Sequence, residues 1–316
     1  MYMQKHLKKQ ISCSGIGLHT GHPVRMTFKP ATVGTGIIFK RIDLEGHPVL
    51  RVEPHNISDL SYATTISDGT CSIKTVEHVL SAAYALGITN LTIEIDSNEA
   101  PVMDGSAACF VNMFLDAGII RRKAANSVIQ FHQALEVRHK DGILSVEPYD
   151  GFKVTYIIDF PNPLIGTQSK TFELSPRGYI NEISHARTFC LYEEVETLLK
   201  MGLSKGGSLD NAVVFAQDRI MNDSLRYHDE PVRHKILDLL GDLAFLGHPV
   251  LGHIKVFKGG HALHTQFVKA TLAHPECWGY LAGHKLPPEL HNNAWERVER
   301  IDIPEVTAFS SSRIFV

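Results

Sequence analysis

Hydrophobic residues dominate one stretch of the chain, residues 232–247, with the sequence VRHKILDLLGDLAFLG. The stretch contains no proline and is followed by a stop signal at residues 247–249, Gly-His-Pro, so the pattern predicts a helix. At about 100° per residue, His234, Asp238 and Asp242 share one stripe, and nearly all other positions are apolar. Because a helix that is apolar on most sides is typically buried, we expect this one to lie in the core.

The polar residues of this stripe need a partner of opposite charge or a bound metal ion, because an unpaired buried charge costs several kcal/mol or more. A His and an Asp four residues apart can both reach one zinc ion, at about 2.0–2.2 Å from each ligand atom. Lys235 lies at the edge of the stripe. The alternative interpretation is a solvated face, since such pairs are common on helix surfaces. The apolar remainder of the helix favours the metal, although the spacing alone does not decide.

The first 125 residues predict several strands and two helices, with one of the strands between the helices. Short β-prone runs lie at residues 27–28, 36–39, 49–52 and 91–95 between Gly, Pro and Asp punctuation. Periodic apolar positions predict helices over residues 72–86 and 108–117. Residues 14–21, SGIGLHTG, carry three glycines and predict a constrained loop. His19 in this loop is most simply interpreted as bonded to the backbone.

Glu77 and His78 lie side by side in the first of these helices. Adjacent helical residues point about 100° apart, so they cannot easily ligate one metal together. One can ligate while the other handles a bound water. In isolation, a surface Glu-His pair is an equally good interpretation.

The second half of the chain repeats the mixture of predicted strands and helices of the first half. Residues 121–127 are the best candidate for a linker, which divides the chain into lobes at 1–125 and 126–316. Strands are predicted at 143–146, 153–160, 212–215 and 253–257, and helices at 193–201, 232–247 and 261–272. The order of elements predicts an α+β fold of two similar lobes, each a two-layer sandwich of a sheet with helices on one face.

Two histidines follow a Gly-Gly turn at residues 259–260. Paired glycines let the backbone approach a ligand, and side chains at the start of a helix often face a cleft. His261 is therefore the better acid–base candidate. We interpret His264 as a packing or capping residue.

Composition excludes several classes of protein. The net charge of −3 over 316 residues gives no reason to expect a nucleic-acid partner. Five scattered cysteines without a CxxC pair indicate free thiols in a reducing compartment. The first residues lack the apolar region of a signal peptide, and no run approaches the ~20 apolar residues of a transmembrane helix. We expect a soluble, cytoplasmic protein.

Together these residues predict a metal-assisted hydrolase of an amide or ester. His78, His234 and Asp238 would be three metal ligands that leave an open position for water. Glu77 can take the proton of that water, and His261 can donate one to a leaving group. Asp242 can orient His261 and hold it cationic, and Thr188 can help stabilise an oxyanion.

Seven motifs in register resemble the UDP-3-O-acyl-N-acetylglucosamine deacetylase family, the zinc amidohydrolases of the committed step of bacterial lipid A synthesis. They are SGIGLHTG (14–21), KTVEHVLSA (74–82), PVMDGSA (101–107), ARTF (186–189), GGSLDN (206–211), HKILDLLGDLAFLG (234–247) and KGGHALH (258–264). The resemblance runs from about residue 1 to 275. It implies two α+β lobes with one zinc ion at their junction and the same ligands, base and acid, while Fe²⁺ also suits a His₂Asp site.

The same resemblance implies the substrate contacts. Lys235 would contact a substrate carbonyl or phosphate, Phe160 and Phe189 would line the sugar and nucleotide region, and residues 191–203 would border a passage for the acyl chain. The chain departs from the family pattern at residues 190–194, CLYEE. The tail after about residue 286 matches no motif, and mobility is one interpretation of it.

Two rival functions remain open at this point. One is a zinc hydrolase of another N-acyl or ester substrate on the same scaffold. The other is a two-lobed ligand-binding protein whose His/Asp stripe is structural. The resemblance favours a deacetylase that acts on UDP-3-O-(3-hydroxyacyl)-N-acetylglucosamine, as a monomer.

Overall fold

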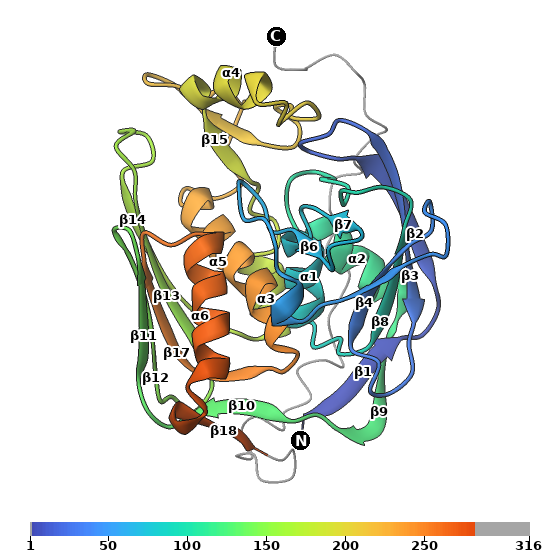
Figure 1. The fold of residues 1–316 in the computed structure, drawn as a ribbon. Coiled ribbons are helices and arrows are strands. Elements are labelled where there is room, and N and C mark those ends of the chain that lie inside the picture. Colours follow the sequence, from blue (N-terminus) through green and yellow to red (C-terminus); the bar gives the residue numbers. More distant parts are fainter. Residues whose placement is uncertain (1, 282–316) are drawn as a thin grey trace.

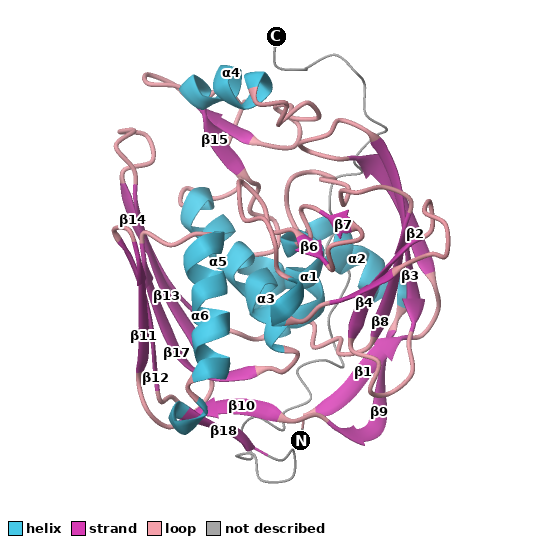
Figure 2. Ribbon diagram, in the orientation of Figure 1, coloured by secondary structure: helices cyan, strands magenta, loops and turns pink. Residues whose placement is uncertain are grey.

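Two β-sheets lie on opposite sides of the molecule, with helices between them (Figure 1; Figure 2). The computed structural model describes residues 2–281. Within that range the chain forms several sheets and six α-helices, so the predicted α+β class is confirmed. The tail after residue 286, for which the sequence suggested mobility, lies outside the described residues.

The first sheet has five strands from the N-terminal part of the chain. Their order is β2 (Ile11–Ile16), β3 (Pro23–Pro30), β8 (Leu91–Ile95), β4 (Ile37–Arg41) and β5 (Val49–Arg51). Phe28, Ile93 and Phe39 pair across the three central strands, and all three are buried. The apolar positions that alternate along each strand therefore form one continuous face against the helices.

The second sheet has seven strands. The order is β11 (Leu135–His139), β12 (Gly142–Glu147), β17 (Val250–Phe257), β10 (Val128–Phe131) and β18 (Trp278–Leu281), while β13 (Phe152–Asp159) pairs with β17 and β14 (Thr167–Glu173). Three two-stranded pairs complete the β structure: β1 (Met3–Leu7) with β9 (Ile119–Ala125), β6 (Ile66–Ser67) with β7 (Ser72–Ile73), and β15 (Phe189–Leu191) with β16 (Val213–Phe215).

The helices are α1 (Glu77–Ala85), α2 (Ala108–Ala117), α3 (Pro176–Glu182), α4 (Tyr192–Lys200), α5 (Glu230–Leu243) and α6 (His261–Ala273). α5 packs against both α1 and α6, and these three lie between the sheets (Figure 1). α4 lies apart from them, at one end of the molecule beside β15. None of the helices in residues 2–281 is long and apolar enough to cross a membrane.

Helix α5 confirms the prediction of a buried helix. It begins at Glu230, continues as a 3-10 turn at Ala244–Leu246, and ends where Gly247 takes a left-handed conformation, with φ of 70°. His234, Asp238 and Asp242 are all buried. The alternative of a solvated polar face is therefore wrong.

Three local predictions are corrected. The helix expected from residue 72 begins at Glu77, because residues 72–73 pair with β6 and Thr75 has a φ of 60°, which a helix cannot accommodate. The linker expected at 121–127 is mostly strand β9, which pairs with β1. The loop expected from residue 14 begins as the last residues of strand β2. In addition, the sequence did not predict helix α3.

Candidate metal centre

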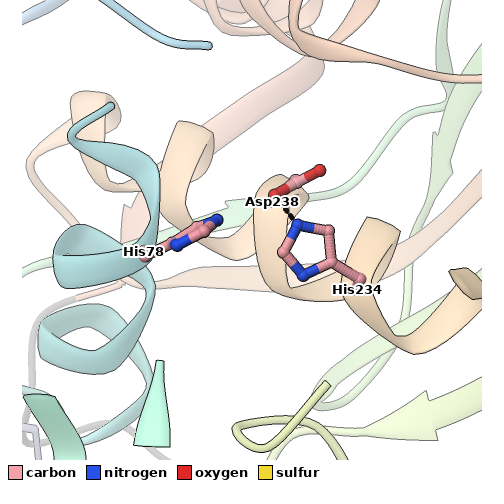
Figure 3. Close-up of side chains that lie close together, drawn as sticks. All are labelled: His78, His234 and Asp238. Atoms are coloured by element: carbon pink, nitrogen blue, oxygen red, sulfur yellow. Dashed lines mark ion pairs between the residues drawn. The ribbon is translucent and has the colours of Figure 1, made fainter. Parts of the chain in front are cut away.

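Three side chains from two helices converge in the core. His78 extends from α1, and His234 and Asp238 extend from α5 toward it (Figure 3). One potential ligand atom from each lies within 4.8 Å of the others. The His234 Nε2 atom is 3.2 Å from Asp238 Oδ1, and the two imidazole rings are 5.1 Å apart between centroids. The structure thus brings together the three residues that the sequence proposed as ligands.

The hydrogen bonds around this cluster leave its ligand atoms free. His234 Nδ1–H donates to the carbonyl of Ala186 at 3.0 Å, which directs Nε2 toward Asp238. Among the described residues, His78 Nδ1 and Asp238 Oδ1 are buried without a hydrogen-bond partner. An unsatisfied buried polar atom costs about 1–3 kcal/mol, so a cation at this position would remove a real penalty.

The charge state of the cluster also suits a divalent cation. Burial lowers the pKa of His78 to about 3 and holds the pKa of His234 below its ordinary value, so both imidazoles are neutral. Burial raises the pKa of Asp238, but the electrostatic effects of the His234 ring and of the Lys235 ammonium outweigh burial and hold it well below its usual range. Two neutral imidazoles and one carboxylate are donors that zinc and ferrous iron both accept.

Close packing of α1 on α5 holds the cluster in place. Gly241 lies one turn after Asp238, and a Cβ atom added to it would lie 2.2 Å from the carbonyl oxygen of Glu77. Only glycine permits this approach of the two backbones. Because Glu77 and His78 occupy the first turn of α1, the contact fixes their distance from the stripe on α5.

An acid–base pair lies beside the cluster. Glu77 Oε1 is 3.9 Å from His261 Nε2, and Glu77 Oε2 accepts the backbone N–H of Thr64 at 3.1 Å. Burial raises the pKa of Glu77 to about 7. Burial lowers the pKa of His261, but the charge and hydrogen bond of Asp242 outweigh it and raise that pKa to about 9. The surface Glu-His interpretation of residues 77 and 78 is wrong, because both are buried.

Asp242 is the centre of a hydrogen-bonded group that includes three residues absent from the sequence-based site, Thr64, Tyr156 and His264. Its Oδ2 atom lies 2.8 Å from the Nδ1 atoms of both His261 and His264, and its Oδ1 atom accepts the Thr64 hydroxyl at 2.6 Å. Tyr156 from β13 contacts His264 at 2.9 Å. Thr64 and Tyr156 lie far from the site in sequence, and neither belongs to a recognisable motif.

Two aromatic rings and a lysine border the cluster. Lys235 Nζ lies 2.9 Å from Asp238 Oδ2 and 5.6 Å from the centroid of the Phe189 ring. The Phe160 ring contacts Phe189 at a centroid distance of 5.5 Å. The structure therefore places the three expected substrate-contact residues side by side. Their roles stay predictions.

A cavity of about 100 Å³ opens between helix α4 and the loop that contains Leu18 and His19. Thr188 and Phe189 line it, together with Leu18, His19, Val195 and Leu198. Both ring nitrogens of His19 are buried. Burial lowers the pKa of the ring, and an interaction with the backbone of Tyr62 opposes that shift, in agreement with the expected contact to the backbone. The cavity is bordered by the segment in which the sequence predicted an apolar passage.

Comparison with known proteins identifies the family. The sequence profile described as "LpxC: UDP-3-O-acyl N-acetylglycosamine deacetylase" matches residues 4–273. The UDP-3-O-acyl-N-acetylglucosamine deacetylase of Thioalkalivibrio sulfidiphilus is 43% identical over 281 residues, which cover 88% of this chain and 92% of that protein. The proteins of the same name from Acidithiobacillus ferrooxidans and Haemophilus influenzae are 42% and 40% identical, each over 89% of this chain and 93% of their own length.

Proposed function

This chain belongs to the UDP-3-O-acyl-N-acetylglucosamine deacetylase family, and we propose that its buried His-His-Asp cluster holds the metal ion for that reaction. The enzyme is a metal-dependent amidohydrolase of lipid A biosynthesis. It removes the N-acetyl group from UDP-3-O-(3-hydroxyacyl)-N-acetylglucosamine and releases acetate. The observation that carries the assignment of the site is the convergence of three ligand atoms from α1 and α5.

His78, His234 and Asp238 would hold one zinc ion per chain, and ferrous iron fits the same donors. Such an ion would act as a Lewis acid and would lower the pKa of a neighbouring water molecule, so that the water can act as a nucleophile at neutral pH. The unpartnered buried atoms of His78 and Asp238 support this ligand set.

Glu77 and His261 perform the proton transfers in this proposal. Glu77 takes a proton from the water that attacks the acetyl carbonyl carbon, and its raised pKa suits a base at neutral pH. His261 gives a proton to the amide nitrogen as the carbon–nitrogen bond breaks, which leaves a free amine and acetate. Asp242 orients His261 and keeps it protonated until that step.

The remaining residues bind the substrate. Thr188 supports the oxyanion, and Lys235 contacts a carbonyl or phosphate oxygen. The rings of Phe160 and Phe189 line the sugar and nucleotide region, consistent with their mutual contact. The cavity beside Phe189, which Val195 and Leu198 border, receives the acyl chain.

The two-lobed arrangement belongs to the same proposal. Lobes at residues 1–125 and 126–316 meet at the metal centre, which takes His78 from the first and the other ligands from the second. The boundary falls between β9 and β10. Five cysteines without a disulfide support a reducing, cytoplasmic location. A monomer remains our expectation.

The decisive experiment measures metal content and acetate release together. We expect about one zinc per wild-type chain and turnover of UDP-3-O-(3-hydroxyacyl)-N-acetylglucosamine but not of simple N-acetyl sugars. His234→Ala should lose both the metal and activity. Glu77→Gln, which removes only the base, should retain zinc while kcat falls by about 10²–10⁴-fold.

The two variants separate the possible failures. A Glu77→Gln enzyme with near wild-type turnover would overturn the role of the base while leaving the ligands intact. A wild-type chain that takes up neither zinc nor iron would make the polar stripe a structural seam, as in a ligand-binding protein. Turnover of unrelated N-acyl compounds at equal rates would favour a different hydrolase on this scaffold.

A further inference from the structure

Two imidazoles share one oxygen of Asp242. The Nδ1 atoms of His261 and His264 both lie 2.8 Å from Oδ2, and the hydroxyl of Thr64 lies 2.6 Å from Oδ1. A carboxylate accepts hydrogen bonds but donates none, so each of these three groups must be a donor. Both imidazoles therefore carry a proton on Nδ1.

Tyr156 fixes the other side of the His264 ring. Its hydroxyl oxygen is 2.9 Å from His264 Nε2, and both residues are fully buried. Burial lowers the pKa of His264 and raises the pKa of Tyr156 well above its ordinary value, so both side chains are neutral. A neutral His264 with its proton on Nδ1 can only accept at Nε2, and the Tyr156 hydroxyl donates to it.

We propose that His264 is a positioning residue for the general acid, because its Nδ1–H holds Asp242 Oδ2 in line with His261. The proposal rests on the role of His261 in the proposed function. His264 follows His261 by one helical turn on α6, so both rings face α5 from the same side. Their shared acceptor ties α6 to α5 at the level of His261 and directs His261 Nε2 toward Glu77.

The alternative is that His264 only fills space. A filler should be replaceable by an apolar ring of similar size, such as phenylalanine. A positioning residue should instead be replaced best by asparagine, whose amide N–H can occupy the place of Nδ1 although the side chain is smaller. The two interpretations therefore predict opposite rankings for His264→Phe and His264→Asn.

Steady-state kinetics of the zinc-loaded enzyme test the ranking. We expect His264→Phe to lower kcat by about 10–100-fold, the order expected when a catalytic group shifts by a fraction of an ångström to 1 Å. KM should stay within about twofold, because the substrate is not contacted. His264→Asn should recover most of kcat. Thr265→Val is the matched control, since its buried hydroxyl has no hydrogen-bond partner among the described residues.

The protonation of the ring gives a readout that does not depend on turnover. In zinc-loaded protein labelled with ¹⁵N-histidine, NMR should show His264 protonated on Nδ1 and unprotonated on Nε2. The Tyr156→Phe variant keeps the ring shape but removes the donor to Nε2, and we expect the His264 proton to stay on Nδ1, where the Asp242 carboxylate accepts it, while the Nε2 resonance shifts. This variant should fold even where His264→Phe does not.

Three results would overturn the proposal. They are a His264→Phe enzyme with wild-type kcat, a His264 ring protonated on Nε2 in the wild type, and a second zinc bound by the wild type and lost in His264→Asn. A second zinc of this kind would mean that Asp242, His261 and His264 bind a metal ion, and their potential ligand atoms do lie within 4.8 Å of one another. Wild-type turnover by His261→Ala would instead contradict the proposed acid, and the NMR result would separate the two failures.

Discussion

At the scale of single residues, Asp242 determines the charge of His261. The carboxylate raises the pKa of His261 to about 9, so the imidazole is protonated below that pH and can act as an acid. We therefore expect kcat/KM to fall as the pH rises through about 9. Asp242→Asn removes the negative charge that raises the pKa of His261. The fall of kcat/KM at high pH should therefore move to lower pH by about 1–3 units, the usual effect of one adjacent charge.

A pH–rate profile of wild type and Asp242→Asn measures this shift directly. Glu147→Gln is the control, because it removes an equal charge from an exposed pair between β12 and β17. Its profile should coincide with that of the wild type. An unchanged basic limb in Asp242→Asn would show that His261 is not the group that titrates there.

Residues that act through local spacing could be predicted from the sequence. His234, Asp238 and Asp242 lie one turn apart on a helix, and periodicity places such residues on one stripe. Thr64 and Tyr156 could not be found this way, because a loop and a strand bring them to the site. The sequence indicates only a packing or capping role for His264, because the bond from His264 to Asp242 depends on how α6 packs against α5.

At the scale of elements, the contact between α1 and α5 depends on Gly241. Alanine is a better helix former than glycine by about 1 kcal/mol, so propensity alone predicts that Gly241→Ala is stabilising. The structure predicts the opposite, because the added Cβ would lie 2.2 Å from the carbonyl of Glu77. We expect the free energy of unfolding to fall by about 1–3 kcal/mol, the usual cost of overpacking.

Denaturant unfolding of Gly241→Ala tests this sign, and zinc affinity should fall with it as the helices separate. Gly260→Ala is the matched control, since Gly260 has an extended backbone and open space around its Cα. Its free energy of unfolding should change little. A more stable Gly241→Ala protein would show that α1 moves away at no cost.

Element boundaries were harder to predict than elements. The strand Leu91–Ile95 and the helix Ala108–Ala117 match the predicted ranges, because alternation and helical periodicity both end at punctuation residues. The predicted helix over 72–86 ran too far toward the N-terminus. Its first residues are apolar enough for a helix, but pairing with β6 draws them into a strand.

At the scale of the whole molecule, the sequence predicted the class but not the topology. Strand β17 pairs with β10, β12 and β13, whose residues lie about a hundred positions earlier. No periodicity specifies such partners, because it reports only which face of a strand is buried. The same holds for strand β9, which the charged residues 121–123 suggested was a linker.

A bound metal should stabilise the whole fold, because its ligands come from distant parts of the chain. A ligand that binds only the folded state adds about 2.7 kcal/mol when its concentration is about 100 times Kd. We therefore expect a chelator to lower the unfolding temperature and added zinc to restore it, in thermal scans followed by circular dichroism. His78→Ala removes the one ligand on α1 and should abolish the response. His274→Ala, an exposed histidine paired with Glu276, should respond as the wild type does. Equal unfolding temperatures with and without zinc would mean that α1 and α5 hold the site without the ion. Bound water would then supply hydrogen bonds to the unpartnered atoms of His78 and Asp238.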